Sequence, residues 1–272
     1  MRGAIIGDII GSVFEGKFNI PADFEFFTPK NTFTDDTVHT LAVAKAIVEH
    51  RKTGIELQSL AEKYLRKFGR QYIWNGCGDM MYKWLMTENV KEYNQTTYTG
   101  AEYKLGYSCG NGAVMRISAC AWLADTLEQA LEYAEKVTLP THNNEDAIRA
   151  AKAVTEAIFL IRFGCDKTEL VDRLILDGLY TPTDISEHTF DITAKGTLNI
   201  AMHYFINSNC FKDCIHKTVL HGGDTDTNAA VAGSLAEAYY GVPREWNKAV
   251  FLKLTPHLID VLKEAEREII PV

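Results

Sequence analysis

Apolar residues recur about every three to four positions along most of the chain, a spacing typical of α-helices with one buried face. The first such segment, residues 4–14, places isoleucine, valine and phenylalanine side chains on one helical stripe. The same spacing predicts helices over residues 38–50, 56–68, 113–124, 126–138, 143–164, 168–177, 191–206, 211–220, 228–240 and 257–268. The seven prolines fall between these segments or at a helix start, where proline is tolerated.

Strand signals are weak by comparison. Residues 93–100 are a candidate for a short extended piece, although the stretch is polar, and residues 17–33 read as a loop rich in phenylalanine and proline. No Ser/Gly-rich linker or low-complexity tract divides the chain. The sequence therefore predicts an all-α fold, a compact orthogonal bundle of roughly ten or more helices that forms a single domain over residues 1–272.

The composition narrows the function classes. Apolar residues make up 46% and charged residues 24% of the chain, which is ordinary for a soluble protein, and the net charge of −8 disfavours a nucleic-acid binder. Asp8 interrupts the apolar N-terminus, so no signal peptide is expected, and no run of about 18 apolar residues predicts a membrane span. The six cysteines show no zinc-binding spacing, which favours reduced thiols in a cytoplasmic protein.

Two acidic clusters lead into helical segments: "FTDDTV" at residues 33–38 and "GGDTDTNA" at residues 222–229. Helix capping is one explanation, because Asp and Thr accept hydrogen bonds from the free N–H groups of a first turn. Capping needs one such residue, however, and each cluster has several. Hard cations such as Mg²⁺ and Mn²⁺ take carboxylate and hydroxyl oxygens as ligands, so a metal site is the other explanation.

Other motifs point less clearly to one chemistry. "DTDTNAAVAGSL" starts like a calcium-binding loop, but Ala229 and Leu235 stand where such a loop needs glycine and glutamate. "GNGAVM" at residues 110–115 lacks a dinucleotide fingerprint, and it reads either as a phosphate cradle or as a plain turn before a helix.

The first helix carries two further patterns. Asp8, Ser12 and Glu15 share one helical face, which is either solvated or part of a site. A second stripe consists of glycines that would let a neighbouring helix approach closely, namely Gly3, Gly7 and Gly11.

Taken together and in this order, the motifs resemble the ADP-ribosylglycohydrolase family, which includes the dinitrogenase reductase-activating glycohydrolase. The resemblance covers nearly the whole chain and implies a compact all-α bundle. It rests on "GDIIGSVFEG" (7–16), "TDDT" (34–37), "GNGAVMR" (110–116), "THNNEDA" (141–147) and "GGDTDTNAAVAGSLAEAYYG" (222–241).

The resemblance implies a binuclear Mg²⁺ or Mn²⁺ site that both acidic clusters build. The implied ligands are Thr34, Asp35, Asp36, Asp224, Asp226 and Thr227. Asp226 is expected to bridge the two ions. Glu15, Asp35 and Asp36 are the catalytic candidates, and Glu15 or Asp35 is expected to assist proton transfer.

The resemblance also implies a substrate site for ADP-ribose. The expected contacts are Gly110, Asn111 and Gly112 for the diphosphate and ribose, His142 beside the ADP-ribose, and Asp79 as a weaker candidate. Two departures stand out: the stretch after His142 lacks the proline that is frequent in the family, and His39 follows "TDDTV", where other residues are common. The missing proline bears on the loop over the adenosine side.

The implied reaction is hydrolysis of the bond between C1″ of the distal ribose and an acceptor, which reverses ADP-ribosylation. Two alternatives stay open: a hydrolase of small free ADP-ribosyl conjugates, and a non-enzymatic member that binds ADP-ribose. The expected partners are an ADP-ribosylated protein or a small ADP-ribosyl substrate, without membrane or nucleic acid. A cytoplasmic monomer is expected, and the sequence leaves the acceptor linkage open.

Overall fold

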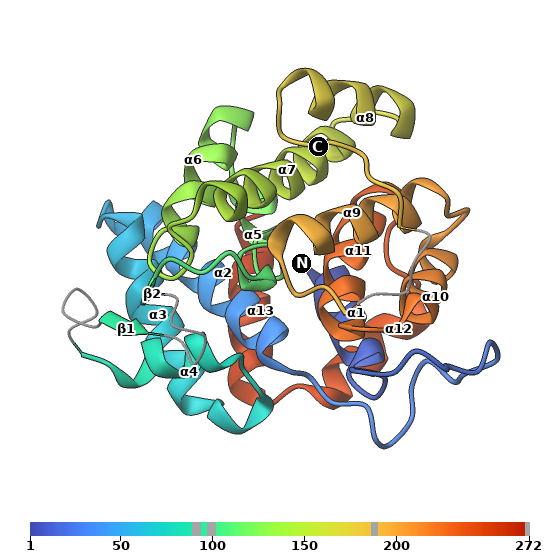
Figure 1. Cartoon of the computed structure of the whole chain (residues 1–272), viewed down its shortest axis with the longest axis horizontal. Coiled ribbons are helices and arrows are strands. Elements are labelled where there is room, and N and C mark those ends of the chain that lie inside the picture. Colours follow the sequence, from blue (N-terminus) through green and yellow to red (C-terminus); the bar gives the residue numbers. More distant parts are fainter. Residues whose placement is uncertain (89–93, 97–101, 186–189, 270–272) are drawn as a thin grey trace.

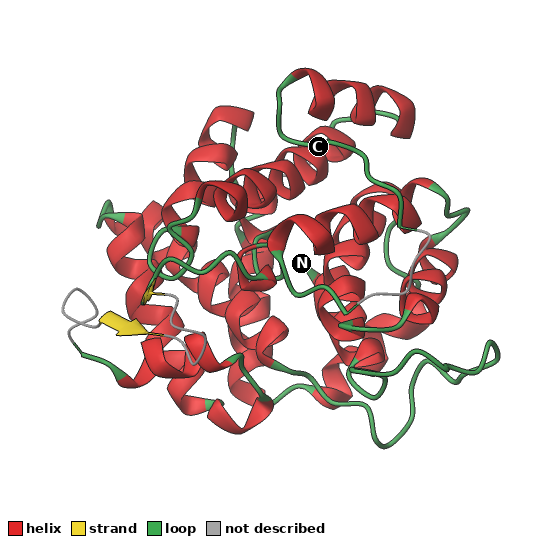
Figure 2. Ribbon diagram, in the orientation of Figure 1, coloured by secondary structure: helices red, strands yellow, loops and turns green. Residues whose placement is uncertain are grey.

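The chain is described by a computed structural model that covers residues 1–88, 94–96, 102–185 and 190–269. Within these residues the chain forms thirteen α-helices and one two-stranded antiparallel hairpin, as Figures 1 and 2 show. The all-α prediction is therefore confirmed. None of the described helices is both long and apolar enough to cross a lipid bilayer.

The helices and strands have the following bounds along the chain. The helices are α1 (Arg2–Gly11), α2 (Asp35–Thr53), α3 (Leu57–Gln71), α4 (Asp79–Met86), α5 (Ser118–Leu123), α6 (Leu127–Thr138), α7 (Glu145–Arg162), α8 (Lys167–Leu176), α9 (Ala194–Ile206), α10 (Phe211–His221), α11 (Thr225–Tyr240), α12 (Arg244–Lys253) and α13 (Pro256–Arg267). The strands are β1 (Asn94–Thr96) and β2 (Glu102–Lys104), and two 3-10 turns occupy Ile73–Asn75 and Asn111–Ala113.

Each segment predicted to be helical contains a helix, and β1 lies in the predicted extended piece. The sequence missed α4 and α12, which are short surface helices with only two fully buried side chains each. Several boundaries differ from the prediction by three residues or more, and two of them have a local cause. α1 stops at Gly11 because the following turns lead into Gly16, whose φ of 75° suits glycine, and α5 starts five residues after the predicted position 113 because turns occupy the intervening stretch. The orthogonal arrangement and the single domain over residues 1–272 stay predictions.

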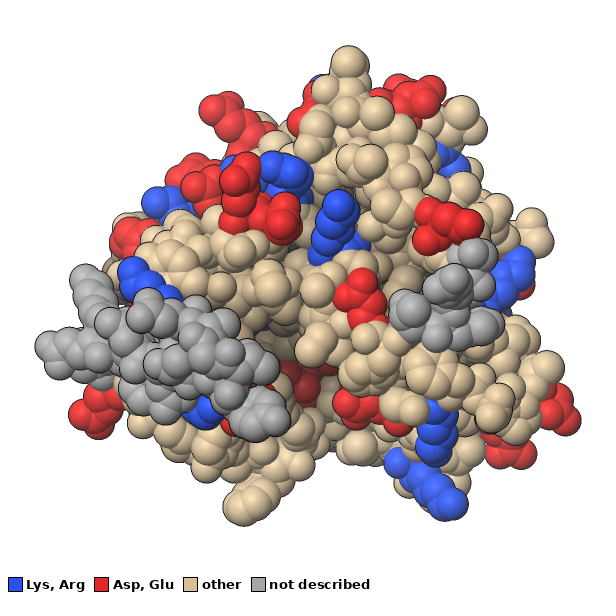
Figure 3. Space-filling model, in the orientation of Figure 1, with Lys and Arg blue, Asp and Glu red and all other residues tan. Residues whose placement is uncertain are grey.

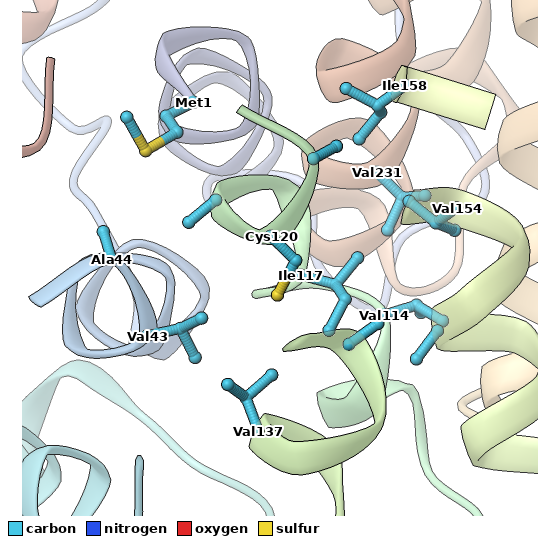
Figure 4. Close-up of a cluster of buried hydrophobic side chains, with 14 of the residues drawn as sticks. Met1, Val43, Ala44, Val114, Ile117, Cys120, Val137, Val154, Ile158 and Val231 are labelled. Carbon is cyan, nitrogen blue, oxygen red and sulfur yellow. The ribbon is translucent and has the colours of Figure 1, made fainter. Parts of the chain in front are cut away.

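A buried apolar core holds the helices together. Figure 4 shows side chains from several of them meeting in one cluster, among them Val43 of α2, Cys120 of α5, Val137 of α6, Val154 of α7 and Val231 of α11. Each of these side chains is fully or almost fully buried. Removal of this apolar surface from water supplies most of the driving force for folding. The core thereby fixes the helix ends that surround the functional site.

The glycine stripe of α1 lets a neighbouring helix approach closely, as the sequence predicts, and this helix is α11. A methyl group on Gly3, Gly7 or Gly11 would overlap the backbone of α11, at Gly233, Ala229 and Thr225 respectively. These three pairings make α1 and α11 antiparallel, and Figure 1 shows the two helices side by side. The C-terminal end of α1 therefore lies beside the N-terminal end of α11. This packing brings the first motif of the chain to the last one.

Candidate metal and substrate site

A cavity of about 560 Å³ opens where the N-terminal ends of α2 and α11 meet the 3-10 turn at Asn111–Ala113. Figure 3 shows this face of the molecule hollowed near its centre, with acidic atoms inside the hollow. The lining includes every site residue that the sequence singled out: Glu15, Thr34, Asp35, Asp36, Asp79, Gly110, Asn111, Gly112, His142, Asp224, Asp226 and Thr227. The fold thus brings together segments from both ends and the middle of the chain.

The first acidic cluster forms the N-terminus of α2. Thr34 is the N-cap, and its hydroxyl oxygen accepts from the backbone N–H of Asp36 over 3.4 Å. Asp36 is buried, and one of its carboxylate oxygens, Oδ1, has no hydrogen-bond partner among the described residues. One residue therefore caps the helix, and the carboxylate of Asp36 is left for another purpose.

Asp8 of α1 is a central residue of this cluster. Its fully buried carboxylate accepts from the backbone N–H and the hydroxyl of Thr34, and from the backbone N–H and the hydroxyl of Thr37, over 2.5 to 3.1 Å. Asp8 was not among the predicted site residues, although its polar character in an apolar helix marked it. Its neighbours come from a helix that starts 27 residues later in the sequence, so only the fold reveals its role.

The second acidic cluster forms the N-terminus of α11, and here capping fails as an explanation. Asp224 occupies the N-cap position without a side-chain capping bond. Its Oδ2 instead accepts from the side-chain amide of Asn111 over 2.6 Å. Asp226 is buried with one carboxylate oxygen, Oδ1, unpartnered in the described part of the chain, and the hydroxyl of Thr227 donates to Asp36 over 3.2 Å. The second cluster therefore faces the first one.

Two overlapping sets of carboxylates lie close enough to share a cation. Asp8, Asp36 and Asp226 form one set, and Glu15, Asp224 and Asp226 form the other, with ligand oxygens within 4.8 Å of one another in each set. Asp226 belongs to both. Hard divalent cations prefer such oxygen donors, and the unpartnered buried oxygens of Asp36 and Asp226 are what a cation would satisfy. The residues therefore fit Mg²⁺ or Mn²⁺.

The electrostatics of the cluster agree with that fit. Burial and neighbouring carboxylates raise the pKa of Asp36 and of Asp226 well above the usual range, and burial together with Asp8 does the same to the pKa of Asp35. Burial also raises the pKa of Asp8 to about 6, against the effect of its threonine hydrogen bonds. The ionised form of this cluster is therefore unfavourable until positive charge enters it.

Glu15 and Asp79 line the same cavity in more open positions. Glu15 is exposed, and partial burial together with Asp224 raises its pKa. The side chain of Asp79 is 77% exposed and pairs with Lys83 over 2.6 Å, one turn further along α4. Of the two, Glu15 belongs to a set of possible cation ligands, whereas Asp79 lies outside both sets.

The glycine turn offers fewer free donors than the sequence suggests. The N–H of Gly110 donates to the hydroxyl of Ser108 over 3.0 Å, and the N–H of Asn111 donates to the carbonyl of Ile192 over 2.8 Å. Among the described residues, the N–H of Gly112 has no backbone partner outside this 3-10 turn. Two of the three N–H groups of the candidate phosphate cradle are therefore used within the protein, by Ser108 and by Ile192.

His142 lies against this turn. Its side chain is buried, and a methyl group on Gly112 would come within 3.0 Å of the imidazole Nε2. Burial lowers the pKa of His142 well below its usual range, and the nearby Arg116 and His39 add to the effect. The imidazole is therefore neutral near pH 7. A glycine at position 112 is required because any side chain there would displace the ring.

Arg116 and His39 belong to the cavity wall and were not predicted as site residues. Arg116 is completely buried, and its Nη2 donates to Thr141 over 2.5 Å. His39 is buried with its Nδ1 4.0 Å from a carboxylate oxygen of Asp35, and burial lowers its pKa to about 3. Arg116 is the last residue of the "GNGAVMR" block, so the sequence did mark this position. No pattern in the sequence indicated a role for His39.

Comparison with known proteins identifies the family of the chain. A sequence model of the family described as ADP-ribosylglycohydrolase matches residues 1–269. The chain belongs to the ADP-ribosylglycohydrolase family. The resemblance stated from the motifs is confirmed, and hydrolysis of an ADP-ribose linkage is the reaction that membership supports.

Three characterised relatives extend over most of the chain. An ADP-ribosylhydrolase ARH3 from Xenopus tropicalis is 23% identical over 90% of this chain and 88% of its own length. An ADP-ribosylarginine hydrolase Tri1 from Pseudomonas putida (strain GB-1) is 26% identical over 92% and 72% of the respective lengths. An ADP-ribosyl-[dinitrogen reductase] glycohydrolase from Rhodospirillum rubrum is 26% identical over 81% and 74%.

A solved structure described as an ADP-ribosylglycohydrolase-related protein complex has the same fold. It superposes with a TM-score of 0.69 at 22% identity, and the match covers 98% of this chain and 95% of the other. At that identity the likeness shows only that the two proteins share a fold. The description of the site in this chain rests on the geometry given above.

Proposed function

We propose that this chain is a metal-dependent ADP-ribosylhydrolase that cleaves the bond between C1″ of ADP-ribose and an acceptor. One observation carries the proposal: two carboxylate sets share Asp226 in the same cavity that holds the glycine turn and His142. One end of the cavity thus suits cations, and the other end suits a substrate with anionic groups. A substrate that reaches from one end to the other would place its glycosidic bond between them.

Two divalent cations, Mg²⁺ or Mn²⁺, would be held by the acidic clusters. Asp36 and Asp226 with Asp8 nearby make one position, and Asp224 and Asp226 with Glu15 make the other. Bound there, the ions supply Lewis-acid attraction for the ribose 2″ and 3″ hydroxyls and for a water molecule. Thr34, Asp35 and Thr227 line the same part of the cavity and complete the proposed ligand set.

The side chains of the site would stabilise charge at C1″ and transfer the proton. Carboxylates near C1″ would stabilise the positive charge that develops there as the glycosidic bond breaks. Glu15 is our first choice for proton transfer to or from the reacting oxygen, because it is the exposed member of the cluster and its pKa is raised. Asp35 is the second choice, since its carboxylate also lines the cavity.

The names of the relatives indicate which acceptors to test. One relative acts on ADP-ribosylarginine and another on ADP-ribosyl-[dinitrogen reductase], so a modified protein is the proposed substrate class here. A panel of arginine-, serine- and aspartate-linked ADP-ribosyl proteins, assayed with Mg²⁺ and then with Mn²⁺, should yield free ADP-ribose from at least one of them. Turnover of small free conjugates alone would favour the small-molecule alternative, and binding of ADP-ribose without any turnover would favour a non-enzymatic member.

A further inference from the structure

A chain of hydrogen bonds runs through the cavity wall behind His142. Arg116 Nη2 lies 2.5 Å from the hydroxyl oxygen of Thr141, and this oxygen lies 2.7 Å from His142 Nδ1. Arg116 and His142 are 0% and 6% exposed, and Thr141 is 5% exposed, so bulk water does not replace these partners. The direction of each bond then follows from the chemistry of the three groups.

The guanidinium of Arg116 has only N–H donors, so the oxygen of Thr141 accepts from it. The hydroxyl of Thr141 has one proton of its own, and the remaining neighbour for this proton is His142 Nδ1. If Nδ1 carried a proton instead, Thr141 would face two donors, and its buried hydroxyl proton would have no acceptor among the described residues. Leaving such a buried group unpaired is unfavourable.

We infer that Arg116 and Thr141 are positioning residues that hold His142 as the tautomer with its proton on Nε2. His142 Nε2 lies beside Gly112, whose N–H has no backbone partner outside the glycine turn among the described residues. The imidazole N–H and the backbone N–H of Gly112 are therefore neighbouring donors in the cavity wall.

The ligand that fits two such donors is an anionic oxygen. In an ADP-ribosylhydrolase it is a phosphate oxygen of the diphosphate, so this assignment rests on the proposed function. The buried positive charge of Arg116 acts in the same direction, since burial lowers its pKa only to about 10 and the group stays protonated at neutral pH. The lowered pKa of His142 keeps the imidazole a neutral donor.

The tautomer is directly measurable by NMR of the protein with ¹⁵N-labelled histidine, without any ligand. The signals of His142 are those that disappear in His142→Asn. The expected spectrum shows a protonated Nε2 and an unprotonated Nδ1. A protonated Nδ1 in the wild-type protein would overturn the inference.

Three variants then test what sets the tautomer. Thr141→Val keeps the side-chain shape but removes the hydroxyl, so we expect a mixed or reversed tautomer and ADP-ribose binding that is weaker by about five- to tenfold. Thr141→Ser should restore both readouts. Thr138→Val is the matched control, because Thr138 is a buried threonine of the same turn whose hydroxyl lacks a partner in the described structure; it should leave both unchanged.

The outcomes separate this inference from the proposed function. An unaltered tautomer in Thr141→Val, or equal effects of Thr141→Val and Thr138→Val, would refute the positioning role even in an enzyme that hydrolyses ADP-ribosyl proteins. Conversely, a wild-type protein that binds no ADP-ribose and releases none would refute the proposed function, while the tautomer result would still stand.

Discussion

The two ends of the cavity differ in the kind of hydrogen-bonding group that they present. At the junction of α1, α2 and α11 the groups are carboxylates, all acceptors when ionised, and burial raises the pKa of most of them. At the glycine turn the groups are donors: the N–H of Gly112, the imidazole of His142 and, behind it, the guanidinium of Arg116. The difference indicates a cavity with one end built for cations and the other for anionic oxygen.

The side chain of Asn111 joins the two ends. Its amide donates to Asp224 in the acidic cluster and to Thr197 of α9, while its backbone belongs to the glycine turn. A ligand that spans both ends would thus contact groups that Asn111 links by hydrogen bonds. Changes at the acidic end should affect cation binding and turnover, and changes at the donor end should affect substrate affinity.

Removal of divalent cations should have the largest effect. Without them the acidic end has no countercharge, so we expect a chelator to abolish turnover and Mg²⁺ or Mn²⁺ to restore it. Release of ADP-ribose from a modified protein is the measurement, with metal content followed by mass spectrometry. Full activity in a sample shown to be metal-free would contradict the binuclear site.

Asp226→Asn should have the next largest effect. Asp224, not Asp226, occupies the N-cap position of α11, and asparagine keeps the size of the aspartate side chain, so loss of the negative charge is the main change. We expect lower metal occupancy and a loss of turnover well beyond tenfold, which corresponds to more than about 1.4 kcal/mol of barrier. The melting temperature of the metal-free variant should equal or exceed that of the wild type, because repulsion is relieved.

A matched control is Asp172→Asn on the exposed surface of α8, which should leave turnover and metal content unchanged. An Asp226→Asn protein that keeps two ions and turns over normally would show that Asp226 is not the bridging ligand.

Gly112→Val tests the donor end. The new side chain would displace His142 and block approach to the backbone N–H, so ADP-ribose should bind roughly tenfold more weakly while metal content stays constant. Calorimetry with ADP-ribose measures this. Gly78→Val is the control, because Gly78 lines the same cavity and a methyl group there meets nothing within 4 Å. Equal dissociation constants for wild type and Gly112→Val would leave the turn a purely structural feature.

The smallest expected effect concerns the pH dependence of stability in the metal-free protein. Since the pKa values of Asp36 and Asp226 are raised in the folded state, the folded protein binds more protons than the unfolded chain. Above the usual histidine pKa of about 6.5, where the buried histidines no longer contribute, its free energy of unfolding should therefore fall with rising pH for as long as these carboxyl groups ionise. The melting temperature should fall with it.

Asp226→Asn should show a smaller fall over the same range, and saturating Mg²⁺ should remove most of it from the wild type. Identical slopes for the metal-free wild type and the variant, measured by thermal unfolding, would mean that Asp226 is not a source of the repulsion.

The sequence by itself determined the helical class, the main helices and many of the residues that line the cavity. These features follow from local regularities: the helical spacing of apolar residues and short blocks such as "TDDT", whose oxygen donors are next to one another in the chain. The glycine stripe also showed that α1 packs closely on a neighbour. The sequence missed α4 and α12, in each of which only two side chains are buried.

Only the tertiary structure decided which groups meet. It placed Asp8 between two threonines of α2, made Asp226 common to both carboxylate sets, and used the N–H groups of Gly110 and Asn111 for internal bonds. Hydrogen bonds and pKa values depend on distances and burial between segments far apart in the sequence, which no local pattern encodes. For that reason many residues of the site were readable from the chain, whereas the roles of Asp8, Arg116 and His39, and the hydrogen-bond partners and pKa shifts of the site, were not.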